Sequence, residues 1–481
     1  MLNRTPIKMS IQLALVGVIS MMFAACSTNP VTGRSQFVLV SPDQELAMGR
    51  NYHPNLVNMY DGEYRDPKLQ RYLEYITLRL HRCSHRSEMP MRFTMLNTSV
   101  INAFAIPGHV YCTRGLLAEF DNEAQFAAVM GHELGHVAAL HSAARMTTQM
   151  LVGLGGMALG AALGDSGDAD LYLTAGLIGA QFFQLSYSRE QEHQADRLGA
   201  YYMALAGWDP REAVAAQILI QSLSSSQPSF FGKYLSTHPP TNERIPEIHS
   251  LISEKRLLDG EFIQGDGIFK ERWDRRLAGL REVNLAFEPY DKGIEKLREG
   301  EFNAALDLAQ QAIEKAPEQP PFYRLKGDAL LGLERYESAR AALNDALERD
   351  PEYVLANISL GRLAMAQERH AEAERQFQTA LQGFPNSAQA LWGMGQACFA
   401  QNKYRQAVPA LEQLVQMTGN RLPQANYLLA VSYDRLSRHL QAFEQYRAAL
   451  VGGLEGDAKA VAERRHRELR EQLQPSEQQQ S

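Results

Sequence analysis

The apolar and polar positions divide the chain into two parts with different periodicity. Between about 27 and 262, short apolar, β-prone runs alternate with longer stretches of helical spacing. This mixture predicts an α+β fold. The predicted strands are 91–96, 100–106 and 109–113, and the Pro-Gly pair at 107–108 supplies turn chemistry between the last two.

From about residue 285 the sequence becomes periodic. Small, aromatic and proline positions recur every 34 residues, which is the period of the tetratricopeptide helical pair. The columns in phase are Gly293, Gly327, Gly361 and Gly395; Ala305, Ala339, Ala373 and Ala407; Pro317, Pro351 and Pro385; and Phe302, Tyr336, His370 and Tyr404. A fifth repeat, around 427–449, is displaced by one residue. Such repeats stack into an all-α superhelix whose concave surface binds segments of other proteins.

The first residues have the pattern of an export signal. A basic start precedes an apolar stretch at 11–25, and a spanning helix would need about 20 residues. Small residues precede Cys26 and resemble a lipoprotein cleavage site, so we expect a signal at 1–26 and lipidation of Cys26. Ser27 then implies tethering to the inner leaflet of the outer membrane, facing the periplasm. The alternative, an ordinary cleaved signal, leads to the same compartment.

Length and charge indicate several domains and protein partners. A chain of 481 residues exceeds one ordinary core. Its net charge of −7 comes from 48 basic and 55 acidic side chains without a basic run, so nothing in it favours nucleic acid. Besides Cys26 only three cysteines remain, which is no disulfide framework.

One predicted helix, capped by Asp121 or Asn122, carries the sequence HELGH. His132 and His136 are separated by one helical turn, so both imidazoles can reach the same metal ion. Glu133, one step round the helix, can hold a water molecule and take its proton. Zinc suits this donor set. The flanking residues are apolar, and a glutamate buried among them would be costly without a task.

A third ligand must come from elsewhere, because no third histidine follows at the metzincin spacing. The best candidate is Glu192, within the sequence YSREQEHQAD, where Glu190 competes. Glu192 and Asp196 form an i,i+4 pair, so one helical face presents two carboxylates. The HELGH helix is expected to reach about His141, which would turn away from the metal and is not among the predicted ligands.

HELGH followed by a distant Glu-x-x-Ala-Asp resembles the HtpX-like and CAAX-type gluzincin metallopeptidase family. The resemblance implies a zincin-like fold, one zinc ion per chain, Glu192 as third ligand and Asp196 as an assisting proton donor. A carboxylate at that position would also orient a metal-bound imidazole. His193 matches a usually basic position and is expected to face solvent.

Two further segments match the same family. Asn102, Ala103, Phe104 and Ala105 resemble a strand that binds substrate at its exposed edge through main-chain hydrogen bonds. An ordinary core strand is the alternative. The loop at 236–241 resembles one that brings its histidine, here His238, to the zinc as a fourth, inhibitory ligand. A plain loop histidine is the alternative for His238.

Two apolar runs at 150–163 and 171–183 flank an acidic stretch between the two ligand segments. Each is shorter than the roughly 20 residues of a membrane pass, and their glycines weaken a helix. We therefore expect the apolar hairpin at 150–183 to shield the cleft or touch the membrane surface. A spanning hairpin is the alternative.

These patterns predict five segments and one function. The segments are a signal (1–26), a zinc metallopeptidase domain (27–262), a linker (263–284), a tetratricopeptide domain (285–455), and a capping helix with a disordered tail (456–481). The resemblance implies a periplasmic zinc endopeptidase with a chaperone-like role, acting on unfolded or misassembled outer-membrane proteins. Its repeats would engage the barrel-assembly machinery. The alternative is a non-proteolytic scaffold or chaperone with a structural or latent zinc site.

Overall fold

The computed structural model describes residues 26–145, 147–148, 186–226, 238, 243–254, 257 and 263–473. They form two compact units. The first contains the described residues up to Arg281 except Pro54–Gly62, and the second contains Pro54–Gly62 together with the described residues from Glu282 onward. The signal before residue 26, the apolar hairpin at 150–183 and the tail beyond residue 473 lie outside the described residues. No helix in the described ranges is both long enough and apolar enough to cross a bilayer.

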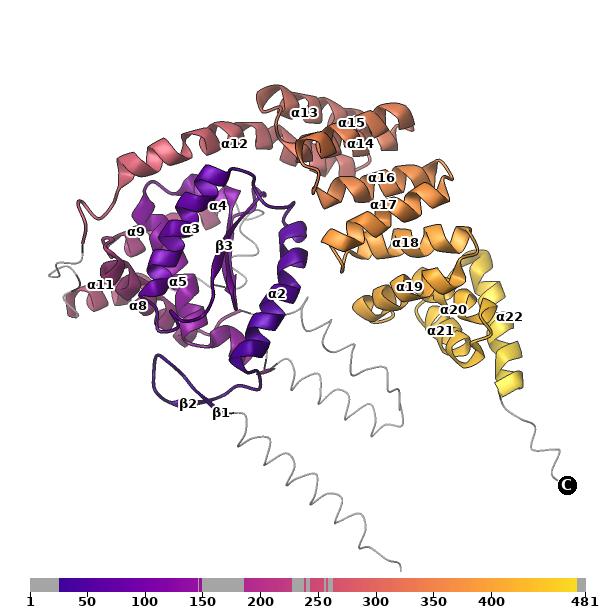
Figure 1. Cartoon of the computed structure of the whole chain (residues 1–481), viewed down its shortest axis with the longest axis horizontal. Helices are drawn as coiled ribbons and strands as arrows, with labels where there is room; N and C mark the ends of the chain where they lie inside the picture. The colour runs from indigo at the N-terminus through magenta and orange to yellow at the C-terminus, as the bar shows by residue number, and fades with distance from the viewer. Residues whose placement is uncertain are drawn as a thin grey trace, which may run out of the picture. The chain divides into compact units, whose positions relative to one another are not determined.

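The first unit is an α+β domain in which helices surround a small sheet, as predicted (Figure 1). Its strands are β1 (Cys26–Thr28), β2 (Ser35–Phe37), β3 (Arg92–Leu96), β4 (Ala103–Ile106) and β5 (His109–Thr113). Its helices are α2 (Pro42–Met59), α3 (Pro67–Arg82), α4 (Arg114–Glu119), α5 (Glu123–Ala138), α8 (Arg189–Ala206), α9 (Glu212–Ser226) and α11 (Arg244–Glu254). The last residues of α2, from Pro54 onward, group with the second unit.

The sheet that lies against α5 has the strand order β3-β5-β4. β4 and β5 form the predicted antiparallel hairpin, and Gly108 has the positive φ of 85° that this tight turn requires. β3 pairs with β5 in parallel, a pairing that the sequence pattern did not predict. β4 is therefore an edge strand, and in the described part of the chain no other strand pairs with its outer side.

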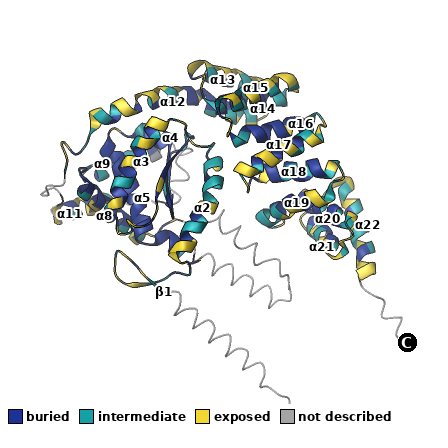
Figure 2. Cartoon of the chain, viewed as in Figure 1, coloured by how far each residue is buried: buried dark blue, intermediate teal, exposed yellow. Residues whose placement is uncertain are grey.

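Local capping fixes the starts of the two helices that carry the site. Asn122 caps α5 by accepting a hydrogen bond from the Gln125 amide, and every residue of α5 is buried (Figure 2). At the start of α8, Ser188 and Gln191 form a reciprocal capping box. These caps set where each helix begins and hence which side chains face its neighbour.

Glycines allow α5 and α8 to approach each other closely. A Cβ atom on Gly199 would lie 2.8 Å from the His132 amide nitrogen, and one on Gly135 would lie 3.0 Å from the Ala195 carbonyl oxygen. A Cβ on Gly131 would lie 3.1 Å from the Gly199 carbonyl oxygen. Main-chain contact between the helices therefore sets the spacing between the HELGH sequence and the two carboxylates of α8.

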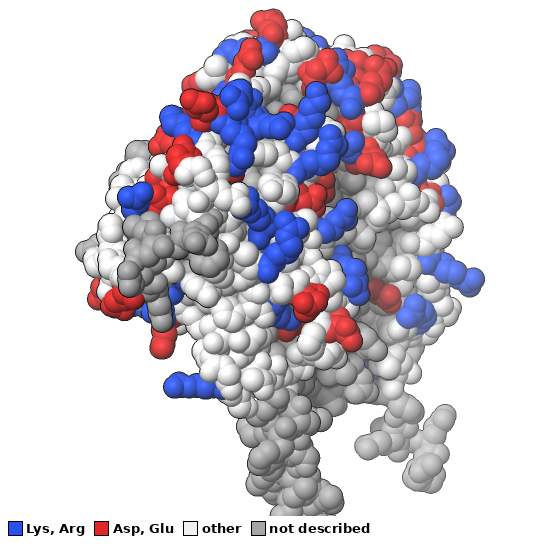
Figure 3. Space-filling model, turned by 60° about the vertical axis from the view of Figure 1, so that its left-hand side comes forward, with Lys and Arg blue, Asp and Glu red and all other residues white. Residues whose placement is uncertain are grey.

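Charged side chains on the face drawn in Figure 3 are mixed, with lysines and arginines gathered in a band among acidic residues.

Within the first unit, the Arg272 guanidinium donates to the buried carboxylate of Glu123 in the first turn of α5, with Nε and Oε2 2.6 Å apart. The Trp208 indole donates to the same carboxylate. These contacts join the segment after α11, which contains Arg272, and the connection between α8 and α9, which contains Trp208, to the start of α5.

The second unit is an all-α array of helical pairs, which confirms the predicted repeats. Its helices are the last part of α12 (Lys270–Arg298), then α13 (Phe302–Lys315), α14 (Pro320–Gly332), α15 (Tyr336–Arg349), α16 (Val354–Ala366), α17 (His370–Gly383), α18 (Ala388–Ala400), α19 (Tyr404–Thr418), α20 (Pro423–Arg435), α21 (His439–Val451) and α22 (Gly456–Leu473). The first helices of successive repeats contact one another: α14 with α16, α16 with α18, and α18 with α20.

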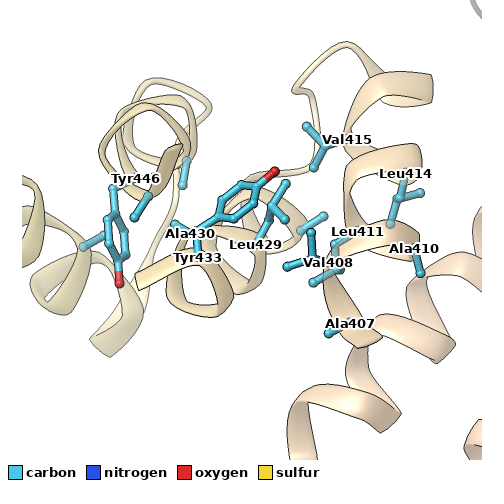
Figure 4. Close-up of a cluster of buried hydrophobic side chains, with 14 of the residues drawn as sticks. Ala407, Val408, Ala410, Leu411, Leu414, Val415, Leu429, Ala430, Tyr433 and Tyr446 are labelled. Carbon is cyan, nitrogen blue, oxygen red and sulfur yellow. The ribbon is translucent and has the colours of Figure 1, made fainter. Parts of the chain in front are cut away.

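The glycine column marks where the two helices of each repeat touch. A Cβ atom on Gly327, Gly361 or Gly395 would lie 2.5 to 2.6 Å from a leucine or phenylalanine side chain of the second helix. The alanine column lies at the same interface and is fully buried. At the C-terminal end, aliphatic side chains of α19 and α20 pack together with Tyr433 and Tyr446 (Figure 4).

Candidate metal centre

Two helices and one loop residue bring four donor side chains together. His132 and His136 come from α5 and Glu192 from the first turn of α8, and His238 joins them. One ligand atom from each lies within 4.8 Å of the others, and all four residues are buried. Among the described residues, this is the one group of His, Cys, Asp and Glu side chains placed to hold a metal ion.

The distances fit a small four-coordinate ion. Nε2 of His132 lies 3.0 Å from Nε2 of His136 and 3.3 Å from Nδ1 of His238. Oε1 of Glu192 lies 3.3 Å from Nε2 of His136 and 3.0 Å from Nδ1 of His238. Zinc bonds of about 2.0–2.2 Å in a tetrahedron place donor atoms roughly 3.4 Å apart. Lone pairs converging at this spacing in a buried site need a cation between them, so the donor set fits zinc.

Asp196 and Arg244 orient the His132 ring and the Glu192 carboxylate. Nδ1 of His132 lies 2.8 Å from Oδ1 of Asp196. The Arg244 guanidinium donates two hydrogen bonds to Asp196, of 2.6 and 2.7 Å, and also lies 3.0 Å from Oε2 of Glu192. Burial would raise the pKa of Asp196, but the charge and hydrogen bonds of Arg244 lower it to about 2. The carboxylate therefore stays ionised, and Arg244, which the sequence analysis missed, holds it.

His136 is oriented by a neutral relay instead. α5 ends at Ala138, earlier than predicted, because Leu140 takes a left-handed φ of 60° and turns the chain. The turn places Nδ1 of His141 2.9 Å from Nδ1 of His136, and Nε2 of His141 3.0 Å from Oε1 of Gln194. One tautomer satisfies both contacts: His136 donates to His141, which donates to Gln194. His141 is not in the donor group: it contacts Nδ1 of His136, whereas the other donors lie near Nε2 of that ring.

Removing this relay should weaken metal binding. We expect His141→Leu to lower zinc affinity by about 10- to 100-fold, because partners that fix the ring of a metal-bound histidine contribute by this much. Competition with a chromogenic chelator measures the affinity. Gln194→Glu keeps an acceptor for His141 and serves as the conservative control. Equal affinities of His141→Leu and the wild type would contradict the orienting role.

Glu133 lies beside the four donors and faces inward. It is 1% exposed, and its Oε1 has no hydrogen-bond partner among the described residues. That oxygen lies 3.6 Å from Nε2 of His238. Burial raises the pKa of Glu133, which makes its carboxylate a better proton acceptor. Burial would also raise the pKa of Glu192. There, however, the His238 imidazole and hydrogen bonds from His136 and His238 outweigh burial and hold the pKa well below its ordinary value.

The structure places two sequence neighbours of Glu192, Glu190 and His193, in different surroundings. Glu190, the competing candidate, is exposed and is not in the donor group. His193 was expected to face solvent, which is wrong: it is 8% exposed, and its Nδ1 lies 2.5 Å from Oε2 of Glu247 on α11. This partner lies 54 positions away, so the local sequence gave no sign of it.

The four residues matched to a substrate strand lie on and beside β4. Ala103 and Ala105 are buried, and Phe104 is half-buried with its ring stacked on Tyr111 at 4.6 Å between centroids. Asn102 precedes the strand and exchanges main-chain and side-chain hydrogen bonds with Thr113. The position of β4 at the sheet edge fits the predicted role in strand addition.

Comparison with known proteins identifies the class. Residues 67–252 match Peptidase family M48, and residues 290–354 and 364–431 match tetratricopeptide repeats. The first match contains all four donors and Glu133. The chain therefore contains a Peptidase family M48 domain followed by tetratricopeptide repeats, which is the organisation that the motifs predicted.

Three similar proteins are named as proteases or endopeptidases. The chain is 27% identical over 357 residues to the β-barrel assembly-enhancing protease of Yersinia pestis, covering 69% of this chain and 72% of that one. It is 30% identical over 254 residues to the Escherichia coli (strain K12) protein of the same name, covering 50% of this chain and 51% of that one. The mitochondrial metalloendopeptidase OMA1 of Arabidopsis thaliana is 33% identical over 162 residues, covering 34% and 31%. The chain thus spans about half the length of the Escherichia coli relative.

Among solved structures, PilF of Pseudomonas aeruginosa aligns with 40% of this chain and 91% of its own length, at 18% identity and a TM-score of 0.35. A thermophilic tetratricopeptide protein of Thermus thermophilus aligns with 37% of this chain and 98% of its own length, at 20% identity and a TM-score of 0.31. Alignments at this level carry no functional inference.

Proposed function

We propose that the chain is a zinc endopeptidase whose ion is held by His132, His136 and Glu192, with Glu133 as general base. The observation that carries the proposal is the convergence of four buried donors next to a buried glutamate that is not one of them. Three protein ligands and an open fourth position are typical of catalytic zinc, whereas structural zinc is closed by four. The position of His238 therefore decides whether the site is open, with three protein ligands, or closed, with four.

Zinc bound there would supply Lewis acidity that polarises a peptide carbonyl and lowers the pKa of water. The chain's own groups supply the proton transfers. Glu133 takes a proton from the attacking water and returns it to the leaving amine. The resemblance assigns Asp196 as an assisting proton donor, but beside Arg244 its carboxylate stays ionised and has no proton to give. Its role in this proposal is to hold the His132 ring. The edge of β4 would hold the substrate as an added strand.

His238 acts, in this proposal, as an inhibitory fourth ligand. Its Nδ1 points at Glu192 and His132, so it completes the donor set. Its Nε2 lies 3.6 Å from Glu133, where the attacking water would have to stand. The enzyme would thus be latent while His238 holds this position. Apart from His238, the loop at 236–241 lies outside the described residues.

Removing the fourth ligand should release activity. We expect His238→Ala to raise the cleavage rate of an unfolded outer-membrane protein by about tenfold or more, because a site blocked most of the time shows only its open fraction. Zinc content, measured in parallel, should remain at one ion per chain. His249→Ala, an exposed histidine on α11, is the matched control and should change nothing. A rate unchanged by His238→Ala would remove the case for latency.

The rival proposal is a scaffold or chaperone with a structural zinc site. The four-donor arrangement favours it, since such closed sites stabilise folds rather than catalyse reactions. The buried Glu133 favours the peptidase instead, because a structural site has no use for it. The roles are compatible if His238 makes chaperoning the resting activity.

We further propose where and on what the enzyme acts. The export pattern before Cys26 favours the periplasm, and lipidation of Cys26 would tether the chain to the outer membrane. Two named relatives are β-barrel assembly-enhancing proteases, which supports unfolded or misassembled outer-membrane proteins as substrates. The tetratricopeptide array would then dock clients or the barrel-assembly machinery.

A further inference from the structure

The first helices of four successive repeats line a hollow in the tetratricopeptide array. The lining residues come from α12, α14, α16 and α18, and the last three of these helices also contact one another in sequence. In repeats of this kind, the surface formed by the first helices is the concave one that binds partners. The hollow has a volume of about 240 Å³, which is enough for one or two side chains.

The lining combines an apolar floor with arginine side chains. Ile294, Leu297, Leu355 and Ile358 supply the apolar part. Arg298, Arg324 and Arg362 supply three positive charges, against the single negative charge of Asp328. Asp328 is 4% exposed and lies 3.2 Å from Arg324 and 3.3 Å from Arg362, so its charge is already shared between two guanidinium groups. Asp61 also pairs with Arg324, so three arginines face two carboxylates, and the one positive charge in excess is complementary to a ligand carboxylate.

A carboxylate of this chain already uses one wall of the hollow. Within the second unit, Oδ1 of Asp61 lies 3.2 Å from Nη2 of Arg324 and 3.3 Å from the Tyr353 hydroxyl, and the Tyr290 hydroxyl donates to the other oxygen. Arg324 in turn donates to both tyrosine oxygens at 3.0 Å. The Arg324 side chain is only 15% exposed, so this is a built carboxylate site rather than a surface ion pair. Arg362, whose side chain is 53% exposed, continues the positive surface toward solvent.

We propose that this hollow binds an extended polypeptide segment in which a carboxylate stands next to an aliphatic or aromatic side chain. The apolar side chain enters between Ile294 and Leu355, and the carboxylate pairs with Arg362 and Arg298. The inference rests on the proposed docking role of the array and gives that role a chemical class of ligand. It does not depend on the peptidase chemistry.

The test uses the full chain carrying Glu133→Gln, so that no probe is cleaved. Its binding to a fluorescein-labelled peptide of alternating leucine and glutamate is followed by fluorescence anisotropy. We expect Arg298→Ala and Arg362→Ala each to weaken binding about fivefold, and the double variant about 20-fold. Raising the salt concentration should weaken binding of the wild-type array further. Arg405→Ala, an exposed arginine of α19 outside the hollow, is the matched control.

Two comparison peptides separate the contributions. Replacing the glutamates of the peptide by glutamine should weaken its binding as much as the double arginine variant does. Replacing the leucines by serine should also weaken binding, both to the unaltered array and to the arginine variants. Equal affinity of the double variant and the control, or of the glutamine and glutamate peptides, would overturn the proposal, as would the absence of saturable binding to the unaltered array. Because no turnover is measured, such a failure would leave the proposed peptidase activity standing.

Discussion

Glu133→Gln should lower the rate of peptide-bond cleavage by about 10²- to 10⁴-fold, the contribution of a positioned general base. The amide cannot accept the proton of water, yet it has nearly the same shape as the carboxylate. Because Glu133 is not one of the four donors, zinc content should be unchanged. The comparison is made on the His238→Ala background, so that latency does not mask the loss.

The matched control for this variant is Glu190→Gln. Glu190 lies near Glu192 in the sequence but is exposed and outside the donor group, so its amide variant should retain both zinc and activity. If Glu133→Gln instead cleaves at a rate similar to that of the control, another group must serve as the base. If it loses zinc, Glu133 contributes to the metal site itself.

Arg244→Met should destabilise the first unit by about 3–5 kcal/mol, the usual cost of removing one partner from a buried ion pair. Arg244 is 1% exposed and serves both Asp196 and Glu192. Methionine fills a similar volume, but it leaves two buried carboxylates without their cation. Denaturant unfolding of the metal-free protein measures the change, and zinc affinity should fall in parallel.

Arg197→Met provides the comparison for this loss. Arg197 also pairs with a glutamate, but at 3.6 Å, and both side chains are nearly half exposed, so removal should cost at most about 0.5 kcal/mol. Arg244→Lys keeps the charge without the two-pronged geometry and should fall between the two. A loss at Arg244 no larger than at Arg197 would mean that the carboxylates are held by other groups.

The sequence was most informative where function depends on positions close in the chain. His132, Glu133 and His136 lie within one helical turn, so helix geometry alone predicted that both imidazoles share a face. Glu192 and Asp196 were paired by the same rule, and the structure brings the two pairs together through α5 and α8. The repeat period likewise predicted the helical array, because each helical pair contacts mainly its neighbours.

The groups that support these donors could not be predicted in the same way. Arg244 reaches Asp196 across 48 positions, and Gln194 reaches His141 across 53. No periodicity links residues so far apart, and an arginine at the start of a helix usually faces solvent. The parallel pairing of β3 with β5 was missed for a similar reason, because β4 lies between them in the sequence but not in the sheet.

The glycine contact between α5 and α8 bears on which ion the site selects. Gly131, Gly135 and Gly199 let the two backbones touch, so donor spacing is set by rigid main chain rather than by flexible side chains. The resulting separations leave room for bonds of about 2 Å, whereas calcium needs six to eight oxygens at about 2.3–2.6 Å. The helix packing itself thus discriminates against larger, harder ions, and a side chain at Gly199 would relax that discrimination by forcing α8 away from the His132 backbone.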